Sequence, residues 1–363
     1  MRFVFFIPDL RGGGAERVVL TLARRLMERG HRVRLVVCQN LVDYAVPEGI
    51  TLEVLLPKGE RLSGSWFARL RMAWRLRRKL RELDRTETPD HLFVASLPYA
   101  WEVVALAGDH RAVFHVHNTL SAPLRSLGRP GKAERRRRRF VDLFRGRRLI
   151  AVSKGVADDL VAEFRVDRQQ ISVVYNPFDI DAVRAAAAEA VEGLPDRKYL
   201  LFVGRNTAQK RVDVLLDAFA QAETDLRLVM LTTPDAALVK MIEERGLSER
   251  VVLPGFQKNP YAWMARAQAL VLSSDFEGFG NVLVEALICG CRVVSTDCAS
   301  GPSEILTGPL ADGLAPVADP KALAEAIRRV LAKPFETDDH GLERFSVDAA
   351  ADAFERLASD LRK

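Results

Sequence analysis

The 363-residue sequence has few cysteines and no long hydrophobic run, and these two absences argue against a zinc-binding protein and against a membrane-spanning one. The spacing of Cys38, Cys289, Cys291 and Cys298 fits no zinc motif, so we expect reduced thiols, as in cytoplasmic proteins, and no bound metal. No uncharged apolar segment approaches the roughly 20 residues that a membrane-spanning helix needs. The apolar run near the N-terminus is too short for a secretory signal. These absences favour a cytoplasmic protein that is not inserted in a membrane.

Acidic and basic side chains are unevenly divided along the chain. Residues 1–176 contain 33 Lys and Arg against 19 Asp and Glu, a net charge of +14. The remaining residues contain 21 against 29, a net charge of −8. This asymmetry indicates that only the first half meets an anionic surface.

Short apolar runs alternate with helical patterns through both halves of the chain. The runs at 2–8, 199–204 and 269–272 are typical of buried parallel strands, and helical spacing follows each. Such alternation predicts an α/β protein with two Rossmann-like domains. Asn176-Pro177 suits a crossing between them. We expect domains at 1–176 and 177–345, followed by a terminal helix within 346–363.

Glu277 and Glu285 flank the start of a helix that follows a short buried strand. The loop between strand and helix is Glu277-Gly278-Phe279-Gly280, and helical spacing of apolar residues begins near Asn281. Glycines let the backbone approach a ligand closely, and amides at a helix start stabilise an anion. The spacing alone is equally consistent with an ordinary strand–turn–helix unit that carries two solvated glutamates.

Two further loops contain residues suited to phosphate. The glycines at 12–14 join the first strand to a helix, although any tight connection of this kind can use glycine. Arg205 and Lys210 lie on the loop after the strand at 199–204, and two cations there suit a diphosphate. The alternative is a pair of solvated loop charges.

Two histidines alternate near the end of a predicted strand at 112–118. A histidine at the carboxyl end of a strand can hydrogen-bond a sugar hydroxyl or an oxyanion. Only one of His115 and His117 is expected to face the edge of a cleft, and a lone histidine is more often structural.

Two arginine-rich segments lie in the basic half. In the helical pattern over 66–83, one broad apolar face is predicted to hold Trp66, Phe67, Leu70, Trp74, Leu80 and Leu83. Basic residues cover the rest of that helix and a second cluster over 132–139, and we expect membrane contacts at Arg75, Arg78, Lys79, Arg136, Arg137 and Arg138. A solvated helix face is the alternative. Nucleic acid would also pair with arginine, but no nucleic-acid-binding motif is present.

The paired glutamates, with Gly-Phe-Gly-Asn between them, resemble the motif of retaining two-domain glycosyltransferases, the large group 1 or GT4 family. The likeness spans nearly the whole chain, and its parts occur in the family's order. It implies the GT-B architecture, two Rossmann-like domains facing a deep cleft, with the last helix crossing back to the first domain. The resemblance implies that the donor is bound by Gly13, Gly14, Arg205, Lys210, Phe256, Glu277, Phe279, Gly280, Asn281 and Glu285. It implies a catalytic set of His117, Arg205, Lys210 and Glu277.

The resemblance also assigns roles. It implies that Arg205 and Lys210 grip the diphosphate, that His117 reaches the sugar near its anomeric carbon, and that Glu277 and Glu285 bind sugar and ribose hydroxyls. Glu277 as a covalent nucleophile is the alternative. The implied reaction is metal-independent transfer, with retention, from a nucleotide sugar to a glycan or lipid-linked acceptor. Family frequency favours a uridine diphosphate sugar as the donor, and a guanosine diphosphate sugar is the alternative.

Such an enzyme would lie at the inner face of the cytoplasmic membrane and build surface polysaccharide or lipopolysaccharide. Two rival interpretations remain open at this stage. One is an epimerase of the same fold, although that family lacks the paired glutamates. The other is a non-catalytic lipid- or nucleic-acid-binding protein that uses the arginine clusters.

Overall fold

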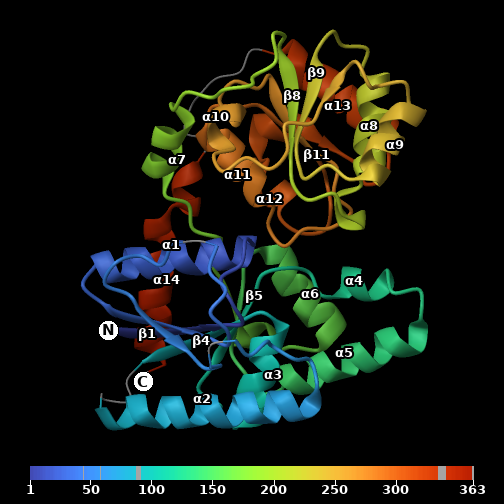
Figure 1. Cartoon of the computed structure of the whole chain (residues 1–363). Helices are drawn as coiled ribbons and strands as arrows, with labels where there is room; N and C mark the ends of the chain where they lie inside the picture. Colours follow the sequence, from blue (N-terminus) through green and yellow to red (C-terminus); the bar gives the residue numbers. More distant parts are fainter. Residues whose placement is uncertain (44, 58, 87–90, 334–340, 362–363) are drawn as a thin grey trace. The chain divides into compact units, whose positions relative to one another are not determined.

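The computed structural model describes residues 1–43, 45–57, 59–86, 91–333 and 341–361 and divides the chain into two compact units (Figure 1). The first unit is Met1–Phe178 together with Phe345–Lys363, and the second is Asp179–Arg344. The domain boundaries expected at residues 176 and 345 stay predictions, because the units are defined by contacts and not by independent folding.

The first unit contains a seven-stranded parallel sheet in the order β3-β2-β1-β4-β5-β6-β7. Its strands are β1 (Arg2–Ile7), β2 (Arg32–Val37), β3 (Thr51–Val54), β4 (Leu92–Ser96), β5 (Val113–Val116), β6 (Leu149–Ala151) and β7 (Ile171–Val173). Its α-helices are α1 (Gly14–Glu28), α2 (Trp66–Thr86), α3 (Pro98–Ala107), α4 (Ser121–Arg125), α5 (Pro130–Phe144), α6 (Lys154–Phe164) and α14 (Val347–Asp360). A 3₁₀ turn, η1, covers Arg168–Gln170, and another, η4 (Leu342–Phe345), lies at the boundary where the chain returns from the second unit.

The C-terminal helix α14 packs on α1 and the first sheet. Its Phe354 is buried against Phe5 of β1, with 6.0 Å between the ring centroids. Asp348 of α14 accepts from Arg25 at 2.7 Å and from Arg29 at 2.6 Å, both on α1. Apolar burial thus provides most of the attachment, since half-exposed ion pairs contribute little each.

The opposite face of this sheet is covered by α3 and α5 around an aromatic core (Figure 1). Trp101 of α3 stacks on Phe114 of β5 at 6.0 Å and meets Phe144 of α5 edge-on at 5.6 Å. The Trp101 indole donates to the Ala95 carbonyl at 2.9 Å, so its one polar atom is satisfied. The aromatic core therefore fixes α5, which carries the second arginine cluster, on the sheet.

Helix α2 corrects one expectation. The apolar residues predicted to share one face do not do so, because Leu80 and Leu83 are buried whereas Trp66, Phe67 and Trp74 are 58%, 77% and 60% exposed. Met72, Ala73 and Leu76 take their place on the buried face, as the structure shows. The aromatic residues consequently share the exposed side of α2 with arginines.

The second unit contains a six-stranded parallel sheet in the order β10-β9-β8-β11-β12-β13. Its strands are β8 (Tyr199–Val203), β9 (Arg227–Leu231), β10 (Val251–Val252), β11 (Ala269–Leu272), β12 (Val293–Thr296) and β13 (Leu314–Ala315). Its α-helices are α7 (Ile180–Ala187), α8 (Val212–Gln221), α9 (Ala236–Glu244), α10 (Tyr261–Met264), α11 (Asn281–Ile288), α12 (Pro302–Ile305) and α13 (Pro320–Ala332). Two 3₁₀ turns complete the unit, η2 (Ala208–Lys210) and η3 (Gly308–Gly313).

The order of the strands indicates where a ligand would bind at the edge of each sheet. Helices α8 and α13 share one core with β8 and β11, while α7, α10 and α11 contact one another. The strand order reverses between β1 and β4 in the first sheet and between β8 and β11 in the second. Ligands of open parallel sheets bind beyond the carboxyl ends of the strands at such a reversal. The loops after these four strands are therefore the first places to look for a site.

Candidate active site

An ion pair joins the loops after β8 and β11. Lys210, at the end of η2, donates from Nζ to Glu277 Oε1 at 2.6 Å. The side chains are 18% and 10% exposed, so both charges are largely removed from water. The two neighbouring strands bring together residues that lie 67 positions apart in the sequence.

The Glu277 carboxylate is also held by a buried serine, which in turn contacts a buried threonine. Ser274 Oγ donates to the same oxygen, Glu277 Oε1, at 2.7 Å. The backbone carbonyl of Ser274 in turn accepts from Thr296 Oγ1 of β12 at 2.6 Å. Ser274 and Thr296 are fully buried, which fixes the position of the carboxylate.

Further hydrogen bonds tie the two loops into one rigid support. The Asp275 amide donates to the Gln209 carbonyl at 2.9 Å, and the Gln209 side chain donates to the Phe276 carbonyl at 2.7 Å. Ser273 Oγ donates to the Lys210 carbonyl at 2.7 Å. Ser274 and Gln209 are not among the site residues predicted from the sequence, because neither residue type indicates a site unless the neighbouring strands are known.

Two glycines allow the backbone after β11 to turn into α11. Gly280 is the N-cap of α11 and has φ +89°, a conformation that favours glycine. Gly301, after β12, has φ +98°, and a Cβ there would lie 1.9 Å from the Phe279 carbonyl oxygen. Phe279 itself is 2% exposed, so its side chain belongs to the core and only its backbone could meet a ligand.

The other donor-site residues predicted in this unit fall into two groups. Glu285 lies one turn into α11, is 5% exposed, and accepts from Tyr261 Oη at 3.4 Å. Asn281 is the first residue of the same helix. Arg205 and Phe256 are exposed, Phe256 at 77%. Arg205 has no ion-pair or hydrogen-bond partner among the described residues, so its charge is available to an anion.

In the first unit, the glycine turn leads directly into α1. Gly13 is the extended N-cap of α1 and Gly14 its first residue. A Cβ at Gly13 would lie 2.1 Å from Glu16 Oε2, so the glutamate carboxylate occupies the space beside this turn. Only glycine fits at this position unless Glu16 moves.

His115 and His117 lie on the same face of the sheet, with 4.0 Å between their ring centroids. His115 is 2% exposed and packs edge-on against Phe354, whereas His117 follows the last residue of β5 and is partly exposed. His117 Nε2 lies 3.3 Å from Ser96 Oγ at the end of β4, and its buried Nδ1 has no partner among the described residues. His117 is thus the histidine at the strand end.

Burial keeps both histidines neutral. It lowers the pKa of His117 to about 3, and it lowers the pKa of His115 well below the usual value, with His117 adding repulsion. A neutral imidazole at the end of β5 can donate or accept a hydrogen bond but carries no charge at physiological pH.

We expect these histidines to make stability depend on pH. Below pH 6.5 the two histidines bind protons in the unfolded chain but not in the folded chain. The free energy of unfolding is therefore unaffected by them above that pH and decreases as the pH falls below it. Each histidine contributes a slope of about 1.4 kcal/mol per pH unit well below its unfolded pKa. Urea denaturation at pH 7.5, 6.0 and 5.0 should show a shallower pH dependence for His117→Gln than for the wild type. The exposed His110→Gln is the control, and equal slopes for all three proteins would contradict the assignment.

The basic residues predicted to meet a membrane are partly engaged within the protein. Arg75 donates to the Leu55 carbonyl at 3.3 Å, and Lys79 pairs with Glu53 at 3.0 Å. Arg137 and Arg138 both pair with Glu134, at 3.0 and 2.8 Å. The Arg78 and Arg136 guanidinium groups lie over the rings of Trp74 and Phe140, at 5.4 and 6.0 Å from the ring centroids.

The described residues contain neither a metal-binding cluster nor a membrane-spanning helix. No group of three or more His, Cys, Asp or Glu residues among them could hold a metal ion. None of the described helices is both long and apolar enough to cross a bilayer.

Sequence profiles of known families match both units. The profile described as glycosyltransferase family 4 matches residues 12–182, and that described as glycosyl transferases group 1 matches residues 197–333. Together they cover most of the chain.

Two curated relatives illustrate the similarity. The N-acetylgalactosamine-N,N'-diacetylbacillosaminyl-diphospho-undecaprenol 4-alpha-N-acetylgalactosaminyltransferase of Campylobacter jejuni is 31% identical over 306 residues, covering 83% of this chain and 82% of the relative. The lipopolysaccharide 1,6-galactosyltransferase of Salmonella typhimurium is 32% identical over 165 residues, covering 43% of this chain and 45% of the relative. The second match thus spans less than half of either protein.

Solved structures show the same fold. Anabaena Alr3699/HepE, crystallised with UDP and glucose, has a TM-score of 0.76 and 20% identity, with 99% of this chain and all of that chain covered. The lipopolysaccharide outer core galactosyltransferase WaaB in its apo form has a TM-score of 0.73 and 22% identity, with both chains fully covered. The expected two-domain α/β GT-B fold is confirmed by these neighbours and by the two parallel sheets.

Proposed function

The chain belongs to the group 1 glycosyltransferases of family 4, and we propose that it transfers a sugar from a UDP-sugar to a membrane-held glycan or glycolipid, with retention of anomeric configuration. Retention is typical of the family. The UDP-bound neighbour supports the choice of nucleotide, and the names of the two curated relatives support a lipid-linked or lipopolysaccharide acceptor. The product would then be part of a cell-surface glycan.

The ion pair of Lys210 with Glu277 is the observation that carries this proposal. Transfer leaves a nucleoside diphosphate whose charge grows as the glycosidic bond breaks, and a cation held at that point stabilises the transition state. Lys210 is held at the carboxyl ends of β8 and β11, where a parallel sheet binds its ligand. Arg205 on the same loop, which has no ion-pair partner among the described residues, supplies a second cation. We propose that these side chains and the amides of α11 offset the diphosphate charge without a metal ion.

Glu277 has a separate part in the proposed mechanism. Its carboxylate, fixed by Ser274, is an acceptor for the hydroxyls of the donor sugar, while Lys210 turns from Glu277 toward phosphate when the donor binds. Because Glu277 already accepts from two donors, we assign it to positioning in preference to nucleophilic attack. Glu285 would accept from the ribose hydroxyls, and the exposed Phe256 would meet the base.

Within the first unit, we propose that the neutral His117 and the glycine turn contact the donor. A neutral imidazole whose Nδ1 has no partner among the described residues can accept a hydrogen bond from a hydroxyl of the donor sugar. Gly13 and Gly14 would bring α1 amides to phosphate, after displacement of the Glu16 carboxylate.

The exposed face of α2 supports an acceptor held in an anionic membrane. Phe67 and Trp74 project from the same helix as Arg77, Arg78 and Arg81, all of them exposed. Aromatic residues favour the interfacial layer of a bilayer, and arginines favour its anionic head groups. We propose peripheral association at the inner face of the cytoplasmic membrane through this face.

Thermal-shift binding of nucleotides tests the proposed donor. UDP should raise the melting temperature of the wild type more than GDP or ADP does, and Glu285→Ala should lose this increase because the ribose contact is gone. A Glu325→Ala variant on α13 is the control, since Glu325 lies outside the site. Turnover of the UDP-sugars, followed by NMR of the product's anomeric proton, then tests retention. Stabilisation by GDP alone would contradict the UDP assignment, and inversion would contradict the proposed stereochemistry.

A further inference from the structure

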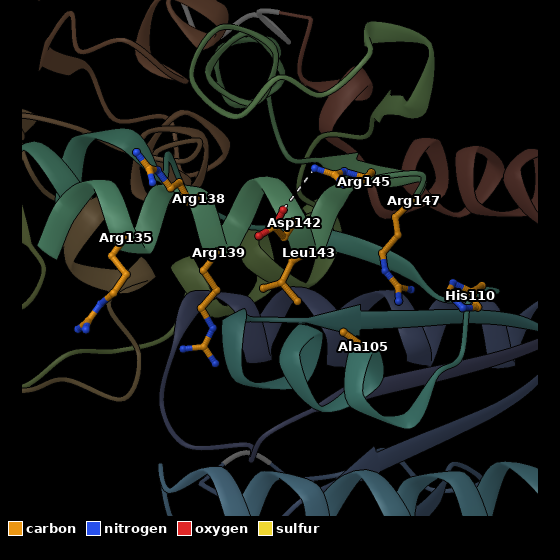
Figure 2. A pocket seen from close by; sticks show the side chains of 9 residues that line it. All are labelled: Ala105, His110, Arg135, Arg138, Arg139, Asp142, Leu143, Arg145 and Arg147. Atoms are coloured by element: carbon orange, nitrogen blue, oxygen red, sulfur yellow. Dashed lines mark hydrogen bonds and ion pairs between the residues drawn. The ribbon is translucent and has the colours of Figure 1, made fainter. Parts of the chain in front are cut away.

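A basic hollow lies between α3 and α5 in the first unit (Figure 2). Its volume is about 540 Å³. It is lined by Ala105, His110, Arg135, Arg138, Arg139, Asp142, Leu143, Arg145 and Arg147. The lining thus contains five guanidinium groups and one carboxylate, so the hollow has a strong excess of positive charge.

Most of these cations remain accessible to a ligand. Arg135 is exposed and has no ion-pair or hydrogen-bond partner among the described residues. Arg145 is 79% exposed and makes only a long 3.4 Å contact with Asp142, shown dashed in Figure 2. Arg138 and Arg139 are 77% and 50% exposed, although each pairs with a glutamate outside the lining. Contacts of this exposure are weak and can rearrange around an anion.

Arg147 shows that the hollow is more than a charged surface. It is 6% exposed, its Nη1 donates to the Asp109 carbonyl at 2.8 Å, and its guanidinium lies 4.7 Å from the centroid of the Phe114 ring. No carboxylate pairs with it among the described residues, because Asp109 is bound instead by Arg111 at 2.9 Å. A buried charge without a counter-ion costs free energy, which an anion in the hollow would offset.

The hollow adjoins the exposed face of α2. His110 lines both this hollow and a neighbouring one that contains Arg77 and Arg81. The same two arginines line a third hollow with Trp74. Adjoining hollows in which arginines outnumber carboxylates therefore extend from Trp74 of α2 to the end of α5.

We propose that the hollow between α3 and α5 binds the phosphate group of an anionic membrane lipid, separately from the sugar-transfer site. The guanidinium fork matches phosphate oxygens, and several forks around one hollow favour a phosphomonoester, which carries more charge than a phosphodiester. This proposal rests on the membrane association proposed above, because the adjoining hollows extend to the α2 face. The head group would orient the first unit on the bilayer.

Vesicle flotation with matched charge variants tests this site. Arg135→Gln/Arg145→Gln removes two exposed cations of the hollow, and Arg125→Gln/Arg148→Gln removes two exposed cations elsewhere in the same unit. The vesicles contain phosphatidylcholine alone, or with phosphatidylglycerol or phosphatidic acid at equal total charge. The wild type should prefer phosphatidic acid. The first variant should lose at least tenfold of that affinity, and the second less than twofold.

The remaining outcomes separate the sources of failure. Equal losses in the two variants, with the wild type still bound, would overturn the site and leave membrane association standing. If the wild type binds to none of the vesicles, both the proposed membrane association and the assignment of the phosphate to a membrane lipid would be wrong. Titration with glycerol 3-phosphate distinguishes a soluble ligand: saturable binding lost only in the first variant, with vesicle binding unchanged, would overturn the lipid assignment.

Discussion

Replacing Lys210 with alanine is expected to lower kcat by about 100- to 1000-fold, the cost of removing one preorganised contact to a charge that develops in the transition state. The ammonium group lies 2.6 Å from Glu277 and is 18% exposed, so no nearby water can replace it well. KM for the donor should change much less than kcat, because the additional negative charge on the diphosphate develops only as the glycosidic bond breaks. Steady-state kinetics with the donor chosen by thermal shift measures both constants.

A structural effect has to be separated from the catalytic one. Lys210→Ala leaves the Glu277 carboxylate, 10% exposed, without its cation, and such a loss destabilises a protein. The double variant Lys210→Ala/Glu277→Gln removes both charges and should recover the melting temperature without recovering turnover. Lys240→Ala, on the outside of α9 and 73% exposed, is the control for loss of one lysine. Near-normal turnover in Lys210→Ala would contradict the diphosphate assignment.

The local elements around this site could be predicted from the sequence. The strand expected at 269–272 is β11 with the same limits, and the helix expected near Asn281 begins at that residue. Both follow from local rules, because a short apolar run and two glycines mark a buried strand and a tight turn. The family and its fold could also be predicted, since the paired glutamates form a specific motif.

The contacts within the site could not be predicted in the same way. Lys210 meets Glu277 only because β8 and β11 are neighbours in the sheet, and the spacing of residues does not state strand order. Ser274 is not among the predicted site residues, because a serine after a strand has many ordinary structural roles. Its importance appears only when its hydroxyl is found 2.7 Å from Glu277 Oε1.

The error on α2 has a different origin. Apolar residues occur on nearly every side of this helix, so no single stripe distinguishes the packed face from the exposed one. In the structure, Met72, Leu76 and Leu80 are buried on the packed face, whereas Trp74 is exposed to solvent. The exposed aromatic residues beside arginines are the part of this helix that suits a bilayer surface, because a cluster of large exposed apolar side chains often marks an interaction site.

Serine substitution of Phe67 and Trp74 is therefore expected to reduce binding to anionic vesicles by about 100-fold. Transfer of each aromatic ring from water into the interfacial layer contributes about 1.5 kcal/mol, and 1.4 kcal/mol is a factor of ten in affinity. The two rings are 77% and 60% exposed, so the folded protein should keep its stability without them.

Flotation with phosphatidylglycerol vesicles measures this loss, and circular dichroism checks that the variant remains folded. Val161→Ser and Val239→Ser, at exposed apolar positions on α6 and α9, form the control pair. Arginine attraction falls with salt whereas ring insertion does not, so the gap between wild type and Phe67→Ser/Trp74→Ser should persist at high salt. A gap that closes there would mean that charge alone holds the protein on the bilayer, and the α2 rings would then have no part in membrane binding.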